Sequence, residues 1–270
     1  MKTRFFRGHR TPSLLLAFLL TLAVMLPLSG LAGVLPSASQ KNLRVKILAF
    51  NDFHGQLSPR IFNGRPIGGA AVLAAYLKKA QTGMKERTLI VSAGDLVGAS
   101  PANSALLQDE PSVMFLSSLA NRHCSNRMSE RCNLVATVGN HEFDEGLAEL
   151  QRMLDGGNHV DGPFLEFPYT GAHYPCLAAN VIDVTTNETF LHPYIVKKVG
   201  KARIAFIGAV VKEAPSMVSP SGVESLRFID EADAINRCVR DIKRKGIKAI
   251  VAVIHQGGDA VNGIVGRLDG

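Results

Sequence analysis

The sequence predicts an α/β fold. Short apolar runs alternate with segments of helical pattern along the chain, which is typical of strands joined by helical crossovers. The predicted strands are apolar on both faces, as expected for sheets that other layers cover. The chain has 270 residues, 46% of them hydrophobic, which is enough for one sizeable core, or for one domain and a piece of another.

The apolar runs place the expected elements in order along the chain. Strands are expected at 44–50, 88–93, 134–138, 177–182, 194–199, 202–207 and 248–254, and helices at 69–79, 111–119, 145–154 and 231–245. Gly200-Lys201 predicts the two-residue turn of a hairpin, and Gly246 predicts the end of the last helix. Residues 155–175 are rich in Gly, Pro and aromatic residues and predict a long loop.

The first 32 residues have the organisation of a secretory signal. A basic start precedes an apolar run at 14–28, and small residues follow it. We expect cleavage after Ala32, with Ala38 as the alternative. An uncleaved membrane anchor is the competing interpretation, but the run is shorter than the roughly 20 residues of a spanning helix. The protein is therefore expected to be exported, to the periplasm or the extracellular space, with no membrane contact after cleavage.

The rest of the chain divides into a lead-in at 33–42 and one domain at 43–270. The whole chain has a net charge of +7, which falls to +3 without the four basic residues of the signal segment. This charge is too small to indicate nucleic-acid or membrane partners. Cys124 and Cys132 bracket a polar loop and predict a local disulfide in an exported protein. Cys176 and Cys238 lie in apolar patterns and are expected to be buried free thiols.

Four predicted strands end directly before residues that can ligate a metal ion. These residues are Asp52 and His54 after the first strand, Asp95 after the second, Asn140 and His141 after the third, and His255 after the last. Each residue alone has an ordinary structural explanation as a loop acid, a turn residue or a core histidine. Because ligands gather at the carboxyl ends of strands in α/β sheets, four such strands together predict one site.

The types of these residues indicate the kind of metal. Asp52 and His54 are two residues apart, so in an extended segment both project to one side. A mixed oxygen and nitrogen set suits Mn, Zn, Fe or Co better than Ca. Asp95 is expected to bridge two ions with its two carboxylate oxygens, as in sites that clamp a transferring phosphoryl group. Asp144 precedes a predicted helix and is also expected to be its N-cap.

The same residues resemble a known family. The order is Asn51-Asp52-Phe53-His54-Gly55, Gly94-Asp95, Gly139-Asn140-His141-Glu142-Phe143-Asp144 and then His255, as in the calcineurin-like metallophosphoesterases. The stretches Ser92-Ala93-Gly94-Asp95 and Gly139–Glu145 resemble the periplasmic 5′-nucleotidase and UDP-sugar hydrolase branch. The resemblance covers about residues 44–265 and implies a layered sandwich of two facing β-sheets flanked by helices.

The resemblance also implies two divalent metal ions and a role for each residue. One ion would be held by Asp52, His54 and Asp95, and the other by Asp95, Asn140 and His255. His141 would stabilise the phosphoryl transition state or protonate the leaving oxygen, and Asp144 would fix the tautomer of His141. The implied activity is hydrolysis of small phosphate esters, most of all 5′-nucleotides or nucleotide sugars, with no nucleic-acid partner.

The sequence departs from the family beyond His255. The family has a later Gly-His-x-His motif, whose histidines complete both metal sites, and a C-terminal nucleoside-binding domain. Neither occurs before Gly270, so the catalytic domain at 43–270 is expected to be incomplete. Two alternatives therefore stay open: a cyclic-nucleotide or other phosphodiesterase of the same superfamily, and a non-catalytic exported binding module or inactive fragment.

Overall fold

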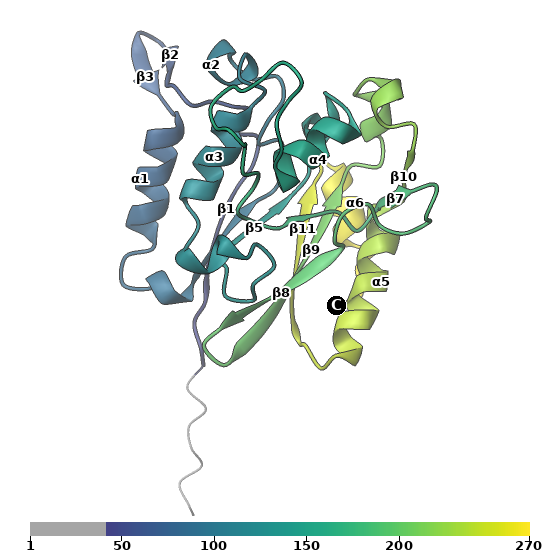
Figure 1. Ribbon diagram of the computed structural model, residues 1–270. Coiled ribbons are helices and arrows are strands. Elements are labelled where there is room, and N and C mark those ends of the chain that lie inside the picture. The colour runs from purple at the N-terminus through teal and green to yellow at the C-terminus, as the bar shows by residue number, and fades with distance from the viewer. Residues whose placement is uncertain (1–41) are drawn as a thin grey trace, which may run out of the picture. The chain divides into compact units, whose positions relative to one another are not determined.

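Two β-sheets lie against each other in the centre of the fold (Figure 1). The first sheet is parallel, in the order β1-β4-β5-β6, and consists of β1 (Lys46–Phe50), β4 (Thr88–Ser92), β5 (Leu134–Thr137) and β6 (Cys176–Leu177). The second has the order β11-β9-β8 and consists of β8 (Tyr194–Val199), β9 (Ala202–Val210) and β11 (Ala249–His255). In it, β9 pairs antiparallel with β8 and parallel with β11.

The facing sides of the two sheets share one hydrophobic core. Val135 of the first sheet and Phe206 of the second are both fully buried in it. At Gly208 the sheets come so close that a Cβ atom would lie 2.5 Å from the Cβ of Leu177 and 2.7 Å from the Oγ1 of Thr137. A side chain at this position would push the sheets apart, so glycine is required there.

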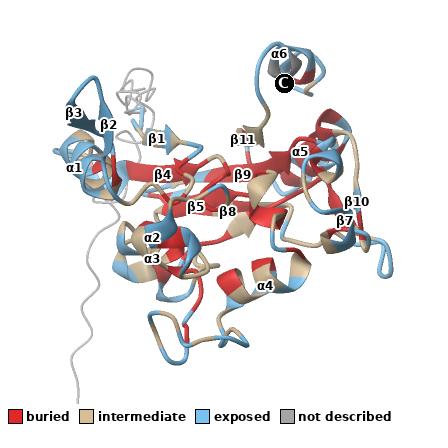
Figure 2. Cartoon of the chain, turned by 90° about the horizontal axis from the view of Figure 1, so that it is seen from above, coloured by how far each residue is buried: buried red, intermediate tan, exposed pale blue. Residues whose placement is uncertain are grey.

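Helices cover the outer faces of the sheets. Helices α1 (Ala70–Ala80) and α3 (Glu110–Ser118) pack on the first sheet, where Leu77 and Leu116 join a core cluster with Ile90. Helix α5 (Glu231–Arg244) packs on the second sheet, where Ile235 contacts the cluster that contains Ile207. Figure 2 shows the buried residues concentrated on the strands and on the inner sides of these helices. The layers confirm the predicted sandwich.

Smaller elements were not expected from the sequence. They are β2 (Arg60–Phe62), β3 (Arg65–Ile67), α2 (Ala102–Ala105), β7 (Val181–Asp183), β10 (Leu226–Phe228) and α6 (Ala260–Val265). Helix α4 (Leu147–Asp155) was expected, and it begins later than predicted. The single strand predicted at 177–182 is wrong, because β6 and β7 belong to different sheets. Between them lies the fully buried Asn180, whose side chain bonds to both backbone groups of Val210 and ends the first sheet.

The predicted N-cap at Asp144 is also wrong. Helix α4 has Gly146 as its N-cap, with a φ of 84°. Asp144 instead ends the short 3₁₀ turn His141–Phe143. The carboxylate is therefore free to bond to a side chain rather than to the helix.

The cysteine predictions are largely confirmed. Cys124 and Cys132 form a disulfide. Cys238 is a buried free thiol, as expected, and Cys176 is free but only partly buried. The hairpin at Gly200-Lys201 is present as β8 and β9, which pair from Tyr194 opposite Ile207 to Val199 opposite Ala202.

The computed structural model describes residues 42–270, of which 43–270 form one compact unit. The predicted signal at 1–32 lies outside the described residues, and so does the lead-in at 33–42 except for its last residue. Within residues 42–270, none of the helices has the length and hydropathy that a membrane span requires.

Candidate metal centre

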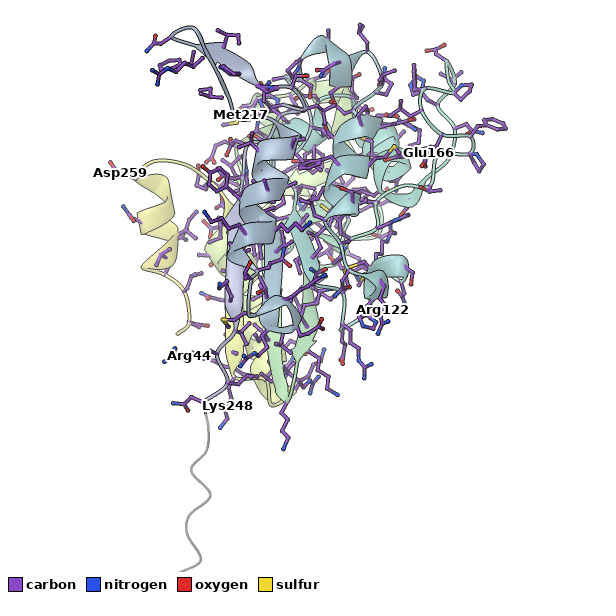
Figure 3. All side chains as sticks on the ribbon, turned by 90° about the vertical axis from the view of Figure 1, so that its left-hand side faces the viewer. Arg44, Arg122, Glu166, Met217, Lys248 and Asp259 are labelled. Carbon is purple, nitrogen blue, oxygen red and sulfur yellow. A yellow bond between two sulfur atoms is a disulfide. The ribbon has the colours of Figure 1, made fainter. Side chains whose placement is uncertain are left out.

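The predicted ligands follow strands that run toward the same edge of the sandwich. Arg44 and Lys248, which precede β1 and β11, both lie at the lower end of the fold (Figure 3). Past the ends of the strands, the loops stay paired. The Asp52 N–H donates to the carbonyl of Gly94 over 3.1 Å, and the His54 N–H donates to the carbonyl of Asp95 over 3.0 Å. The loops after β1 and β4 are therefore held together as a platform.

Asp95 is the centre of this platform, and only 4% of it is exposed. Its Oδ2 lies 3.2 Å from the Nε2 of His255 and 3.6 Å from the Nε2 of His54. Its Oδ1 accepts a hydrogen bond from the His141 N–H over 3.0 Å. The two oxygens therefore have different partners. The expectation that Asp95 bridges with both oxygens does not match this arrangement, in which Oδ2 alone faces both imidazoles.

The two imidazoles are oriented for ligation. The Nδ1 of His54 lies 2.9 Å from the carbonyl oxygen of Gly98, and the Nδ1 of His255 lies 2.8 Å from that of Ala93. Because a carbonyl oxygen only accepts, each Nδ1 carries the hydrogen. Each Nε2 then faces Asp95 and, once it carries no proton, can offer its lone pair to a metal ion, which is the usual arrangement of histidines that bind metal ions.

Asp52 lies at the exposed side of the same cluster. Its Oδ1 is 3.7 Å from the Nε2 of His54, so the first predicted set, with Asp95 as its third member, comes together. The structure also groups ligand atoms of Asp52, Asp95 and His255 within 4.8 Å of one another, and likewise those of His54, Asp95 and His141. This grouping differs from the predicted division between two ions, and it adds His141 to the candidate ligands.

Asn140 is next to His141, at the start of the 3₁₀ turn, and is partly buried. Its place in the chain agrees with the predicted second metal site. Its role as a ligand remains a prediction.

The backbone of the platform is strained. Asp52, His54 and Asp95 have φ values of 51°, 46° and 53°. Residues other than glycine rarely adopt this left-handed region, and such strain is concentrated at functional sites. Gly139 lies so close that a Cβ on it would be 2.1 Å from the Oδ1 of Asp95. The carboxylate thus occupies space that only a glycine leaves free.

Asp95 and His255 form a coupled pair. Burial lowers the pKa of His255, but its hydrogen bond and charge interaction with Asp95 outweigh burial and raise that pKa to about 9. Burial likewise raises the pKa of Asp95, and His255 and the His141 N–H outweigh it, so the pKa is lowered. Without a metal ion, His255 therefore carries a proton at neutral pH. A metal ion that binds Nε2 must displace that proton.

His141 and Asp144 form a second pair beside the cluster. The Nδ1 of His141 lies 2.7 Å from the Oδ2 of Asp144, as the resemblance implied. The ring of His141 meets that of His54 edge to face, with 4.9 Å between centroids. Burial lowers the pKa of His141, but the hydrogen bond and charge of Asp144 raise it more, so the pKa is above its usual value.

Glu142 is a buried residue for which the sequence analysis assigned no role. Its Oε1 accepts the N–H of Leu96 over 2.8 Å, and its Oε2 accepts those of Asp95, over 3.0 Å, and Gly139. Burial and the charge of Asp95 raise the pKa of Glu142, and the three N–H donors oppose that rise. The sequence offered one indication that Glu142 has a role in the site: it lies next to His141, inside the motif that resembles the family.

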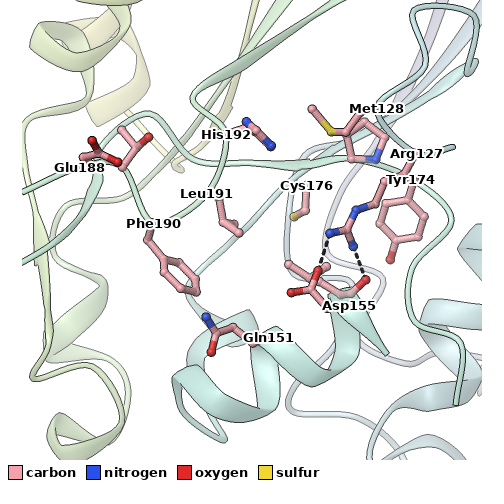
Figure 4. A pocket seen from close by; sticks show the side chains of 13 residues that line it. Arg127, Met128, Gln151, Asp155, Tyr174, Cys176, Glu188, Phe190, Leu191 and His192 are labelled. Atoms are coloured by element: carbon pink, nitrogen blue, oxygen red, sulfur yellow. Dashed lines mark hydrogen bonds and ion pairs between the residues drawn. The ribbon is translucent and has the colours of Figure 1, made fainter. Parts of the chain in front are cut away.

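A separate pocket of about 370 Å³ lies between the C-terminal half of α4, the disulfide loop and residues 188–192 (Figure 4). Arg127 reaches across one side of it to Asp155 and to the carbonyl of Leu154. None of the predicted site residues lines this pocket. The chemistry that the sequence predicts therefore belongs to the strand edge alone.

The donor set at the strand edge fits divalent metal ions. It combines buried and half-exposed carboxylates with two imidazoles whose Nε2 atoms are available, and it lacks thiolates. Such oxygen and nitrogen sets suit Mn, Zn, Fe or Co. A layered α/β fold with this cluster at its strand ends defines a candidate metal-dependent hydrolase.

Comparison with known proteins identifies the family. A family model described as calcineurin-like phosphoesterase matches residues 45–266, and the chain belongs to this family. Endonuclease YhcR of Bacillus subtilis is 38% identical over 84% of this chain, and cell wall protein Lmo0130 of Listeria monocytogenes is 36% identical over 93%. The chain spans only 18% and 32% of the length of these two relatives.

Nucleotidases are among the related proteins. The structure of Haemophilus influenzae NAD nucleotidase matches with a TM-score of 0.61 and 25% identity, covering 82% of this chain and 35% of that one. Related curated proteins include 5′-nucleotidases and a 2′,3′-cyclic-nucleotide 2′-phosphodiesterase/3′-nucleotidase. The chain is therefore a calcineurin-like phosphoesterase domain related to the nucleotidases.

Proposed function

We propose that this protein is an exported two-metal phosphoesterase that hydrolyses nucleotides, with residues 43–270 as part of its catalytic domain. The observation that carries the proposal is the convergence of the Nε2 atoms of His54 and His255 on one oxygen of Asp95. Together with Asp52 and Asn140, these residues would hold two divalent ions. Bound there, the ions would supply charge stabilisation for the transferring phosphoryl group and an activated water.

The remaining chemistry belongs to the chain itself. Asp144 accepts the Nδ1 hydrogen of His141 and orients the ring, so that the Nε2 of His141 is available to the substrate. The raised pKa of His141 favours its protonated form, which can donate a proton to a leaving oxygen. His141 thus acts as the general acid and Asp144 as its positioning residue.

The preference for nucleotides rests on the relatives. NAD nucleotidase and the 5′-nucleotidases are named for nucleotide substrates. Export is supported by the signal pattern, by the disulfide between Cys124 and Cys132, and by the relative named as a cell wall protein.

A second candidate function is cleavage of phosphodiester bonds in nucleic acid. The 38% identical relative is named an endonuclease, which favours this candidate although the low net charge does not. Phosphate release from AMP and cleavage of single-stranded DNA, each measured with and without Mn²⁺, separate the two functions. Mn²⁺-dependent phosphate release is the expected result. Cleavage of DNA alone would favour the second candidate, and no hydrolysis of either substrate would contradict the proposal.

A further inference from the structure

We propose that Glu142 is a positioning residue that holds the two metal-binding loops at a fixed separation through its carboxylate. The inference rests on the proposed metal site. The loop after β4 carries Asp95, and the loop after β5 carries Asn140 and His141. The side chain of Glu142 accepts backbone hydrogen bonds from both of these loops.

The loops need such a connection because their own backbones do not pair. The strands β4 and β5 stay in register only as far as Ser92 opposite Ala136. Beyond this point the backbones press together, and a Cβ on Gly94 would lie 2.5 Å from the nitrogen of Gly139. By contrast, the loops after β1 and β4 continue to exchange direct backbone hydrogen bonds. At the β4–β5 junction, hydrogen bonds to the carboxylate of Glu142 take the place of backbone hydrogen bonds between the two loops.

The contacts are matched to a carboxylate. Both oxygens of Glu142 accept only N–H groups, from Asp95, Leu96 and Gly139, and the residue is only 7% exposed. Without these acceptors, each buried N–H group would lose its hydrogen bond, which destabilises the junction. One of the three donors belongs to the residue whose Oδ2 faces both imidazoles, so a shift of this junction moves the centre of the metal site.

The side chain of Asp95 provides a second link between the same two loops. Its Oδ1 accepts the His141 N–H over 3.0 Å, across the same two loops. Glu142 and Asp95 thus reach across the junction in opposite directions, each from one loop to the backbone of the other. Loss of the Glu142 carboxylate leaves a single link to set the distance between Asp95 and Asn140, the residues predicted to share an ion.

Glu142→Gln tests this role, because an amide has the same size but turns an NH₂ group toward N–H donors. Glu110→Gln is the matched control, since Glu110 is a buried carboxylate that accepts the Leu165 N–H and pairs with Arg152. Hydrogen exchange measures protection of the Asp95, Leu96 and Gly139 amides. Titration of the protein with Mn²⁺, followed by electron paramagnetic resonance, measures affinity and the coupling between two bound ions.

In Glu142→Gln we expect loss of amide protection and weaker binding of the second ion by about 10–100-fold, as for other partners of metal ligands. The signal of coupled Mn²⁺ pairs should give way to that of single ions, while Glu110→Gln keeps wild-type affinity. Unchanged affinity in Glu142→Gln, or an equal loss in both variants, overturns the inference. If the wild-type protein binds no Mn²⁺, the proposed function fails, and amide protection alone decides whether Glu142 holds the loops.

Discussion

Asp95 and Lys197 are both buried ionisable side chains, but they lie near opposite ends of the strands and have different partners. Asp95 has an imidazole or an N–H group at each oxygen. Lys197, on β8, has 0% exposure and one acceptor, the carbonyl of Ser129 at 3.1 Å in the disulfide loop. Burial lowers the pKa of Lys197 to about 7.

This difference separates two uses of buried polar groups. At the carboxyl ends of the strands, strained backbone and charged side chains lie close together, and each oxygen of Asp95 has a partner of its own. These contacts keep the candidate metal ligands in position. At the other end, the disulfide loop is hydrogen-bonded to β8, where the Lys198 N–H donates to the carbonyl of Glu130 over 2.7 Å. Substitutions at the first end should therefore change metal binding and rate, and substitutions at the second should change stability.

The largest effect is expected for Asp95→Ala. It removes the oxygen that both imidazoles face, so metal ions and hydrolysis should be lost together. Loss of several kcal/mol of transition-state stabilisation corresponds to a decrease in rate of at least about 10³-fold. Metal content after dialysis and phosphate release measure the two effects. A variant that keeps both would contradict the assignment of Asp95 as the centre of the site.

His141→Ala should separate rate from metal binding. A positioned acid contributes about 10²–10⁴-fold to the rate, and we expect a decrease in this range with metal content unchanged. The structure sharpens this test, because His141 also lies in a candidate ligand group with His54 and Asp95. If His141→Ala loses metal ions, His141 is a ligand and its role as general acid is wrong.

Asp144→Asn should slow turnover less, by about 10–100-fold, because the amide still occupies the space beside His141 but no longer stabilises its protonated ring. Asp144 raises the pKa of His141. Without that charge the protonated form is lost at lower pH, so the decline of the rate toward high pH should begin earlier. A pH–rate profile measures the shift. Asp155→Asn, which alters the exposed partner of Arg127, is the control and should leave the profile unchanged.

Lys197→Met should change stability and leave the rate unchanged. Because the folded-state pKa of about 7 lies below the ordinary 10.5, the folded protein binds fewer protons than the unfolded chain between these values. The free energy of unfolding therefore rises with pH across this window, by at most about 1.4 kcal/mol per pH unit. The methionine variant should lose that slope and gain about 1–3 kcal/mol near pH 6. Denaturant unfolding at several pH values tests this, and an unchanged slope would show that Lys197 is not the cause.

The comparison also explains what the sequence could predict. The candidate ligands Asp52, His54, Asp95 and His255 could be proposed because each lies at or shortly after the end of an apolar strand, and strand ends meet at one edge. The same logic failed at 177–182, where one apolar run continues across two strands of different sheets. Only the buried side chain of Asn180, which bonds to β9 at Val210, separates them.

Other features depend on contacts between distant residues. The orientation of His255 is set by the carbonyl of Ala93, which is 162 positions away in the chain. The role of Glu142 depends on how closely two loops approach, and residue type does not reveal that distance. The N-cap predicted at Asp144 was wrong because its bond to His141 competes with capping, and Gly146 begins the helix instead.

The most direct test of the central claim is a crystal of the protein soaked in Mn²⁺ and measured by anomalous scattering. We predict two peaks about 3.5–4 Å apart, the spacing of two-metal hydrolases, both in contact with Asp95 and with one histidine ligand each, His54 and His255. A single peak held by His141, or no peak at the strand edge, would contradict the account.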